Sequence, residues 1–291
     1  MRQVLTGFLA AFWLSTAHAA PVLTPDSVVP LAMDAPVFGG FSSLEVATDG
    51  RSFTATSDRG LLMEGDILRE NGRMVGVENL VLSPILDTKG APLAGLNSDA
   101  EGLAIGPDGA IYMSFEGNHR IMRQPVAGAL PDFVPKHPDF RSLINNSGLE
   151  ALAVAEDGVI FAIPERSGAV DRPFPVYRLL DTGWDKAWEI ERRGEYLVTG
   201  ADILNNQLYV LERDLVGIFG FSSRIRRFSI GDGLGPEEVL ITTRTRQFDN
   251  LEGIALWQSP EGQTRALMIS DNNFRFFQQS QLVEMVLEGG G

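Results

Sequence analysis

Acidic residues recur at regular intervals along this 291-residue chain, and they are its strongest candidates for chemistry. One set of acids opens short segments of alternating apolar residues, and a second set closes the segments that follow. The opening acids are Glu45, Glu101, Glu150, Asp202 and Glu252, and the closing acids are Asp58, Glu116, Glu165, Glu212 and Asp271. Carboxylates gathered in one place bind hard cations such as Ca²⁺, which takes about six to eight oxygen ligands.

The opening acids recur with a regular spacing. They are separated by 56, 49, 52 and 50 residues, which gives a period of about fifty. Repeats of this length are typical of propellers and solenoids. Apolar residues alternate after each opening acid, as at Leu103 and Ile105 or at Leu152 and Val154, and this period of two predicts half-buried strands. The acids therefore belong to a repeating β-structure that must position them.

A tight turn and further strands complete each repeat. Turn dipeptides such as Asp108-Gly109 tolerate positive φ and favour a hairpin between the first two strands. Weaker strand signals follow, so each repeat has about four strands, as a propeller blade does. We predict an all-β, five-bladed β-propeller over residues 20–291, with six blades as the alternative. The segment Val22–Leu31 is expected to supply the last blade's missing strand and close the ring.

Composition limits the range of functions. Lys and Arg number 24 against 38 Asp and Glu, a formal net charge of −14, which argues against a nucleic-acid partner because phosphates need a basic surface. The absence of cysteine excludes disulfides, thiol nucleophiles and cysteine-based zinc sites. No apolar stretch is long enough to span a membrane. We expect a monomer that acts on a small molecule.

The N-terminus has the features of an export signal. Arg2 is followed by an apolar run over Val4–Leu14, and a small-x-small cleavage site ends at Ala19. The sequence therefore predicts a signal peptide over residues 1–19, cleaved after its last residue. Residues 20–291 would then form a single domain in the periplasm or outside the cell.

Hairpin geometry predicts that opening and closing acids face each other, because residues equidistant from a turn lie opposite each other in an antiparallel hairpin. This rule gives three facing pairs, Glu101 with Glu116, Glu150 with Glu165, and Glu252 with Asp271. The first strand of each blade lines a propeller's channel, so the acids should form two concentric rings at one mouth. Like charges placed so close destabilise a sheet. Either a bound cation or arginines such as Arg59, Arg166 and Arg213, which directly follow closing acids, must compensate them.

The acids and their neighbours can be given chemical roles. We predict a divalent cation, with Ca²⁺ as the first choice, held by Glu101, Glu150, Glu252 and Asp271. Proton transfer is assigned to Glu116, Glu165 or His119, and recognition of an anionic substrate to Arg120 and Arg166. Amide oxygens could complete the ligand set, from Asn97, Asn118, Asn145, Asn146, Asn250, Asn272 and Asn273. No EF-hand loop, H-E-x-x-H motif or G-x-S-x-G motif is present.

The same segments resemble a known family. The matching segments are Asn97 to Gly117, Asn146 to Glu150 with Ile163 to Arg166, Asn250 to Ile254, and Ser270 to Phe274. In order and spacing they resemble the phytase-like family, also called "esterase-like activity of phytase", over nearly the whole mature chain. The resemblance implies a β-propeller that hydrolyses ester or phosphoester bonds. β-Propeller phytases are similar in holding calcium with acidic residues to bind phosphate, although their D-A-x-D-D-P-A signature is not found here.

Three functions follow from these features. The first is an exported hydrolase of phosphoester or ester bonds that depends on a divalent cation at the acidic mouth of the channel. The second is a non-catalytic binding propeller in which the channel acids are structural. The third is a metal-dependent lactonase.

Overall fold

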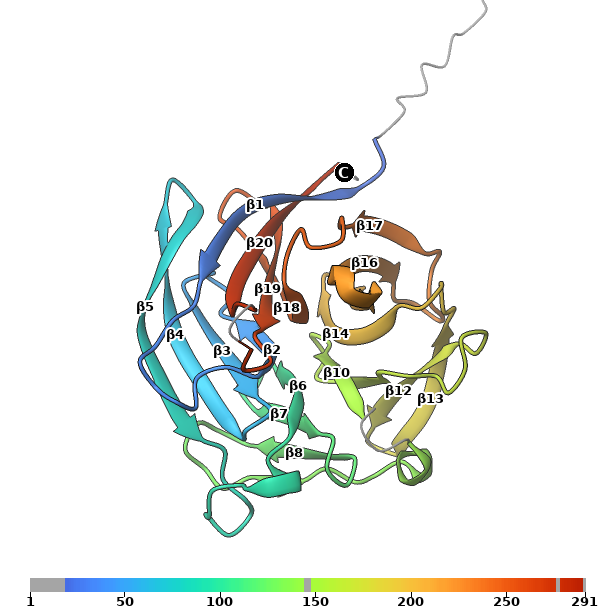
Figure 1. Cartoon of the computed structure of the whole chain (residues 1–291). Helices are drawn as coiled ribbons and strands as arrows, with labels where there is room; N and C mark the ends of the chain where they lie inside the picture. Colours follow the sequence, from blue (N-terminus) through green and yellow to red (C-terminus); the bar gives the residue numbers. More distant parts are fainter. Residues whose placement is uncertain (1–18, 144–147, 276–277, 290–291) are drawn as a thin grey trace, which may run out of the picture.

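The chain forms five four-stranded antiparallel sheets arranged in a ring (Figure 1). The computed structural model describes residues 19–143, 148–275 and 278–289. The first strands of successive blades are neighbours around the ring, and the last contacts the first. The fold is thus the predicted all-β, five-bladed propeller, and the six-bladed alternative is wrong for the part of the chain described. No helix in that part is long and apolar enough to cross a membrane.

The strands are assigned to the blades in chain order, except that β1 joins the last blade. Blade 1 contains β2 (Phe41–Val46), β3 (Ser52–Ser57), β4 (Leu61–Glu70) and β5 (Arg73–Pro84). Blade 2 contains β6 (Ala100–Ile105), β7 (Ile111–Phe115), β8 (Arg120–Gln124) and β9 (Asp132–Phe133). Blade 3 contains β10 (Leu149–Val154), β11 (Ile160–Pro164), β12 (Phe174–Leu180) and β13 (Gly183–Ile190).

The remaining two blades complete the ring. Blade 4 contains β14 (Leu197–Leu204), β15 (Gln207–Leu215), β16 (Phe221–Ser229) and β17 (Glu238–Thr242). Blade 5 contains β18 (Asn250–Gln258), β19 (Thr264–Asp271), β20 (Gln281–Glu288) and β1 (Val22–Pro30). Short 3-10 helices lie in three loops, η1 (Gly95–Asn97), η2 (Pro138–Ser142) and η3 (Gly217–Phe219).

The two ends of the chain share the fifth blade. Strand β1 pairs antiparallel with β20, from Val22 opposite Glu288 to Pro30 opposite Gln281. Figure 1 shows β1 lying along β20 on the outside of the blade. This arrangement confirms that the N-terminal segment supplies the missing strand. Closing the ring in this way stabilises the sheet, because each blade then packs between two neighbours and no blade is left with an uncovered face.

Five hydrophobic cores hold the blades together, one between each pair of neighbours. Blade 1 packs on blade 5, for example, through Phe41 and Leu44 against Ala255 and Ile269, all of them buried. Because a strand presents alternate residues to opposite faces, each blade buries both of its faces against neighbours. As a result, the strand ends and the loops that join them are left to carry polar chemistry.

The loops divide into two sets at opposite ends of the channel. The predicted tight turns join the first and second strands of each blade at one end, with left-handed residues such as Gly109 and Asn205. Each second strand then runs to the other end, where Glu116 and Glu165 directly follow β7 and β11. This second end is called the acidic mouth below.

Candidate active site at the acidic mouth

Each innermost strand carries a β-bulge near the acidic mouth. The bulge residues are Ser42, Glu101, Glu150, Thr199 and Glu252, in blades 1 to 5 in that order. A bulge adds one residue to one strand of the pair and re-aims its side chain. The charges of the three glutamates act on one another, as expected if the bulges bring them to one level of the channel.

The bulges also change the register that the sequence predicts. The residues opposite Glu116, Glu165 and Asp271 are Asp99, Gly148 and Asn250. The predicted facing of Glu101 with Glu116, Glu150 with Glu165 and Glu252 with Asp271 is therefore wrong by two residues. Each bulge adds one residue to the first strand and accounts for one of the two. The other is present between the bulge and the turn, where pairs such as Leu103 with Met113 are already offset by one residue from the predicted register. The side chains are nevertheless close, since the charge of Glu116 acts on Glu101 and that of Glu165 on Glu150.

The opening acids of blades 1 and 4 lie at a different level from the other three. Glu45 and Asp202 follow the bulge residues Ser42 and Thr199 by three positions, so they lie further down the channel. The prediction that they join the ring at the mouth is therefore wrong. It rests on matching acids by residue type, whereas the strand register places a hydroxyl side chain at the mouth in both blades.

The ring of closing acids is interrupted in blade 4. Glu212 lies one position earlier in the ladder than Glu165 does in blade 3. Its carboxylate is fully buried and accepts hydrogen bonds from Arg224 at 2.7 Å and Arg226 at 2.9 Å. The residue at the level of the other closing acids is Arg213. A cation of the protein itself therefore replaces the fifth acid of this ring.

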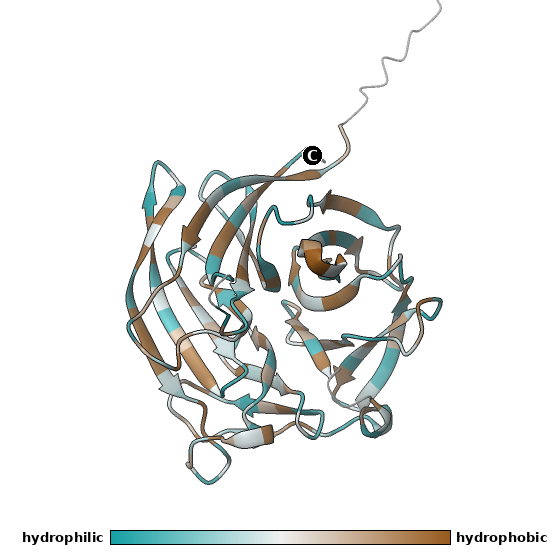
Figure 2. Cartoon of the chain, viewed as in Figure 1, coloured by the Kyte–Doolittle hydropathy of each residue, from teal (hydrophilic) through white to brown (hydrophobic). Residues whose placement is uncertain are grey.

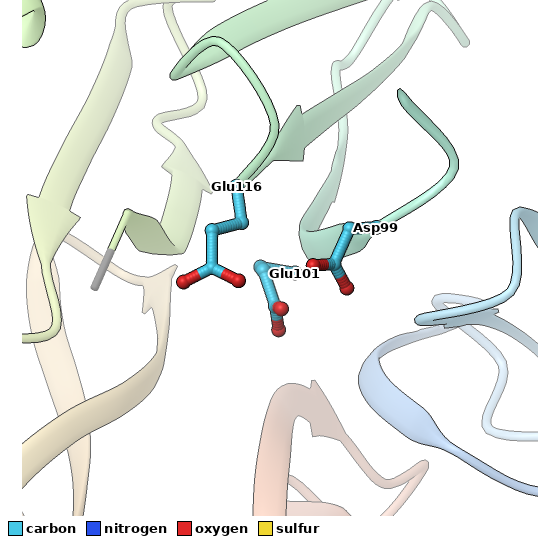
Figure 3. Close-up of side chains that lie close together, drawn as sticks. All are labelled: Asp99, Glu101 and Glu116. Atoms are coloured by element: carbon cyan, nitrogen blue, oxygen red, sulfur yellow. The ribbon is translucent and has the colours of Figure 1, made fainter. Parts of the chain in front are cut away.

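Asp99, Glu101 and Glu116 of blade 2 form a compact group of carboxylates (Figure 3). One oxygen from each residue lies within 4.8 Å of the others. Burial raises the pKa of Glu101 well above its usual range, and the charges of Glu150 and Asp99 raise it further. Burial likewise raises the pKa of Glu116 to about 7, with a contribution from its hydrogen bond to Asp99. Across the described residues no lysine or arginine forms an ion pair with this group.

Arg213 neutralises the opposite sector of the mouth. Its guanidinium forms an ion pair with Glu252 and a second one, at 3.4 Å, with Glu165. It also donates a hydrogen bond of 2.8 Å to the Oδ1 of Asn250, whose Nδ2 donates to Glu252 at 2.6 Å. Burial raises the pKa of Glu252 to about 7 against the opposing charge of Arg213. Blades 3 to 5 thus form a charge-compensated sector, and blade 2 does not.

Glu150 lies between these two sectors. Burial raises its pKa well above the usual range, and the charges of Glu165 and Glu252 add to this, whereas Arg213 opposes it. Glu165 is also bound from outside by Arg166, at 3.0 Å, and the Arg166 side chain is 48% exposed. The compensated sector therefore presents one accessible guanidinium beside the buried carboxylates.

Two aspartates extend the acidic charge from blade 5 through blade 1 to blade 2. Burial raises the pKa of Asp58 to about 6, and the charges of Asp271 and Asp99 contribute to the rise. Burial also raises the pKa of Asp271. The loop before β2 fits over this pair only with glycine, because a Cβ on Gly40 would lie 2.1 Å from the Oδ1 of Asp58 and its φ is +64°.

His119 and Arg120 are both buried beneath the loop that follows β7, each only 6% exposed. The guanidinium of Arg120 donates hydrogen bonds to the backbone carbonyls of Gly117 and Asn97. Neither ring nitrogen of His119 makes a hydrogen bond of regular geometry among the described residues. Burial lowers the pKa of His119, and a longer interaction with the backbone of Leu143 opposes this shift. Arg120 thus fixes the loop that carries Glu116, and the catalytic role of His119 stays a prediction.

Some predicted features lie outside the described residues. These are the amide ligands Asn145 and Asn146 and residues 1–18 of the signal peptide. Among the amides that are described, Asn118 donates its Nδ2 to the Oδ1 of Asn97 at 3.2 Å. A ligand role for these amides stays a prediction.

Comparison with known proteins identifies the family. A family model named Phytase-like, with the description "Esterase-like activity of phytase", matches residues 36–274. The chain belongs to this family. No curated protein matches it.

The solved structures that resemble the phytase-like chain are distant. The PQQ-bound aldose sugar dehydrogenase of Streptomyces coelicolor has 14% identity and a TM-score of 0.47, with 91% of this chain and 100% of that one covered. The WD40 repeats of RRP9 have 11% identity and a TM-score of 0.48, with coverages of 93% and 100%. These likenesses carry no argument about chemistry.

The sequence-based list of site residues for the phytase-like propeller lacks Asp99 and Arg213. A signal for the first is present, because Asp99 precedes Glu101 by two residues as Asn250 precedes Glu252, and both positions face a closing acid. Arg213 is named from the sequence only as one of three arginines that could compensate the acids, since it follows an acid just as Arg59 and Arg166 do. Only the strand register distinguishes them.

A second pair of acids lies further down the channel of the phytase-like propeller. Asp202 accepts backbone hydrogen bonds from Ile203 at 2.6 Å and from Leu256 at 2.5 Å, and Glu45 accepts one from Ile105 at 3.3 Å. Burial raises the pKa of Asp202 to about 7. Burial and the charge of Asp202 raise the pKa of Glu45 well above its usual range. Ionising this pair therefore opposes folding.

Replacing Asp202 by asparagine should make the phytase-like propeller more stable at high pH and leave it unchanged at low pH. The carboxyl binds its proton more tightly in the folded protein, at a pKa of about 7, than at its usual value of 3.8. Stability is therefore lost as the pH rises from about 4 to about 7. We expect the Asp202→Asn variant to gain on the order of 2 kcal/mol at pH 8 in urea unfolding.

The matched control for this prediction is Asp132→Asn, since Asp132 is exposed on the outer strand β9. It should keep the wild-type dependence of stability on pH. If the unfolding free energy of the Asp202→Asn variant depended on pH as that of the wild type does, ionisation of Asp202 would not be what lowers stability at high pH.

Proposed function

We propose that this phytase-like propeller is an exported hydrolase of phosphoester or ester bonds that depends on a divalent cation at the acidic mouth. The observation that carries the proposal is the charge asymmetry of the mouth. Arg213 forms ion pairs with Glu165 and Glu252, whereas Asp99, Glu101 and Glu116 form no ion pair among the described residues, and the charge of Arg213 acts on Glu101 only at longer range. Grouped carboxylates without a counter-charge are costly unless they share protons or bind a cation.

The donor set of blade 2 fits a hard cation such as Ca²⁺. It consists of carboxylate oxygens alone, and these are the ligands that hard cations prefer. Asp99, Glu101 and Glu116 would hold the ion, with Glu150 as the nearest further carboxylate, and the predicted ligands Glu252 and Asp271 complete the surrounding acidic ring. A bound Ca²⁺ would supply Lewis acidity toward a phosphoryl or carbonyl oxygen of the substrate.

The other residues of the mouth would position the substrate and accept a proton. Glu150 is our first choice for the proton of the attacking water, because its carboxyl lies between the carboxylate group of blade 2 and the charge-compensated sector, close enough for the charges of both to act on it. The predicted bases Glu165 and His119 stay as alternatives, although Glu165 already bonds to two arginines. Arg166 is exposed enough to bind an anionic group, whereas Arg120 is engaged by backbone carbonyls.

Turnover on a defined substrate panel tests this proposal. The panel is 4-nitrophenyl phosphate, 4-nitrophenyl acetate, phytate and a γ-lactone, each with Ca²⁺, after chelation by EGTA, and after Ca²⁺ is restored. We expect hydrolysis of at least one phosphoester or acyl ester that is lost on chelation and recovered with Ca²⁺. A preference for the lactone would favour the lactonase function.

The opposite result is also defined. If no substrate turns over and elemental analysis of the purified protein finds no divalent metal, the hydrolase proposal is wrong. The non-catalytic propeller is then favoured by the way Arg213 and Asn250 already bind the Oε1 of Glu252. Export belongs to the same proposal, and cleavage after Ala19 would leave strand β1, which begins at Val22, whole.

A further inference from the structure

A large cleft opens directly beside the acidic mouth. Its volume is ≈ 1020 Å³, and its walls come mainly from the loops of blades 4 and 5 and from the loop that follows β11 in blade 3. Glu165, Arg213 and Asn250 line both this cleft and the charge-compensated sector of the mouth. A molecule bound at the mouth can therefore extend into the cleft without crossing the protein wall.

One wall of the cleft is apolar and exposed. It is the tip of the β15–β16 hairpin, where Leu215 and Ile218 line the cleft and are 60% and 93% exposed. The neighbouring Phe219 is 64% exposed. Figure 2 shows the η3 segment of this tip in brown, standing in front of blade 4. Large apolar side chains gathered in water and rimmed by polar residues are typical of binding surfaces.

The apolar tip has a defined backbone conformation. The N–H of Val216 donates to the carbonyl of Gly220 at 2.9 Å, and the N–H of Phe219 donates to the carbonyl of Val216 at 3.0 Å. Gly217 and Gly220 adopt left-handed φ values of +53° and +102° to make the turn. A turn held in this way presents its side chains at fixed positions, so ligand binding would cost little ordering entropy.

Positive charge lies beside the apolar tip. Arg246 also lines the cleft, and its stem packs against the tip, because a Cβ on Gly220 would lie 2.8 Å from the Cγ of Arg246. Arg246 is exposed, and Arg166 lines the same cleft nearer the mouth. Guanidinium groups favour phosphate dianions, to which they can donate two hydrogen bonds at once. The cleft therefore combines cationic groups with an apolar surface.

We infer that the substrate of this site is a phosphomonoester of an apolar alcohol, with its phosphate at the acidic mouth and its hydrocarbon part on the η3 tip. This inference rests on the proposed hydrolase function and names its substrate class. In the reaction, the oxygen of water bonds to phosphorus and the ester P–O bond breaks. The alcohol leaves with a proton, and inorganic phosphate remains.

Binding of alkylphosphonates, which cannot be hydrolysed, tests the inference. Ethyl-, butyl- and octylphosphonate are titrated calorimetrically into the full chain in the presence of Ca²⁺. We expect affinity to rise by about threefold to fourfold for each methylene buried on the tip. Ile218→Ser should lower the affinity for octylphosphonate about tenfold or more and leave that for ethylphosphonate unchanged.

The control variant is Val126→Ser, which also replaces an exposed apolar residue by serine. Val126 is 59% exposed and lies in the loop that follows β8, away from the η3 tip. It should bind all three phosphonates as the wild type does. Equal affinity for the three phosphonates in the wild type would overturn the inference, even if 4-nitrophenyl phosphate is hydrolysed with Ca²⁺. The inference would also be wrong if affinity in Ile218→Ser still rose with chain length. It would likewise be wrong if the wild type bound anionic lipid vesicles, lost that binding in Ile218→Ser, and showed no chain-length effect with the phosphonates. Absence of all hydrolysis together with the expected chain-length dependence would reject the hydrolase function alone.

Discussion

Replacing Glu101 by glutamine is expected to abolish both cation binding and cation-dependent hydrolysis while making the metal-free protein more stable. Glu101 is the central member of the carboxylate group in blade 2, one oxygen of each residue lying within 4.8 Å of the others. Groups that only orient a metal ligand already contribute about 10–100-fold to affinity, so loss of a direct ligand should cost at least about 100-fold in Ca²⁺ affinity. Hydrolysis at a fixed low Ca²⁺ concentration should fall by a similar factor.

The gain in stability without metal has a separate cause. Burial and the charges of Glu150 and Asp99 raise the pKa of Glu101, so its ionised form opposes folding. A raised carboxyl pKa means that stability is lost as the pH rises toward that value. Neutral glutamine removes this loss, and we expect a gain of about 1–2 kcal/mol at pH 8 in the presence of EGTA.

Thermal unfolding with EGTA and with excess Ca²⁺ measures both effects. Ca²⁺ at one hundred times its dissociation constant should stabilise the wild type by about 2.7 kcal/mol and the Glu101→Gln variant by almost nothing. Glu45→Gln is the matched control, because Glu45 is also a channel acid with a raised pKa but lies outside the group in blade 2. It should gain stability without metal and keep the full response to Ca²⁺. If Ca²⁺ stabilised the Glu101→Gln variant as much as the wild type, Glu101 would not be a ligand, and the proposed cation site in blade 2 would be wrong.

The architecture could be predicted from the sequence because it depends on patterns that survive in every repeat. The period of about fifty residues, the alternating apolar residues and the turn dipeptides each report on local structure, and together they require five similar hairpins. The closing strand could be predicted from chain length, since the last repeat ends too early. The structure bears this out in the pairing of β1 with β20.

The site could be predicted only in part, because a bulge has no strong sequence signature. Measured from the bulges, Glu45 and Asp202 lie three positions further down the channel, and Arg213, in place of Glu212, lies at the level of the other closing acids. A weaker signal was available in the residue that follows each bulge, which is small in all blades: Ser43, Gly102, Ala151, Gly200 and Gly253.

The need for a small residue at that position has a physical cause. The innermost strands converge toward the axis, so their backbones approach closely there. A Cβ on Gly253 would lie 2.7 Å from the Cα of Ser43 in the next blade, and one on Gly102 would lie 2.9 Å from the carbonyl oxygen of Glu150. Aligning the repeats on this small residue, and not on the acids, places Ser42 and Thr199 at the bulges.

Truncating Glu284 to alanine is expected to cost about 3–5 kcal/mol of folding stability, the largest effect of any single substitution proposed here. Its carboxylate is fully buried on β20 and accepts hydrogen bonds from Arg69 at 2.6 and 2.8 Å and from Arg265 at 2.8 Å. The indole N–H of Trp257 also donates to it, at 3.1 Å. Arg69 belongs to blade 1 and the other partners to blade 5, so this carboxylate joins the two blades where the ring closes.

The cost arises because two guanidinium groups would remain with most of their surface buried and with too few acceptors. Arg69 and Arg265 have side-chain exposures of 13% and 9%, so water cannot fully replace the missing carboxylate. Glu238→Ala is the matched control, since it removes an ion pair of similar length, 2.8 Å to Arg227, from a residue whose side chain is 38% exposed. Such pairs contribute no more than about 1 kcal/mol. Urea unfolding should separate the two variants clearly, and a loss in Glu284→Ala no larger than in Glu238→Ala would mean that the hydrophobic core between blades 1 and 5 closes the ring without this carboxylate.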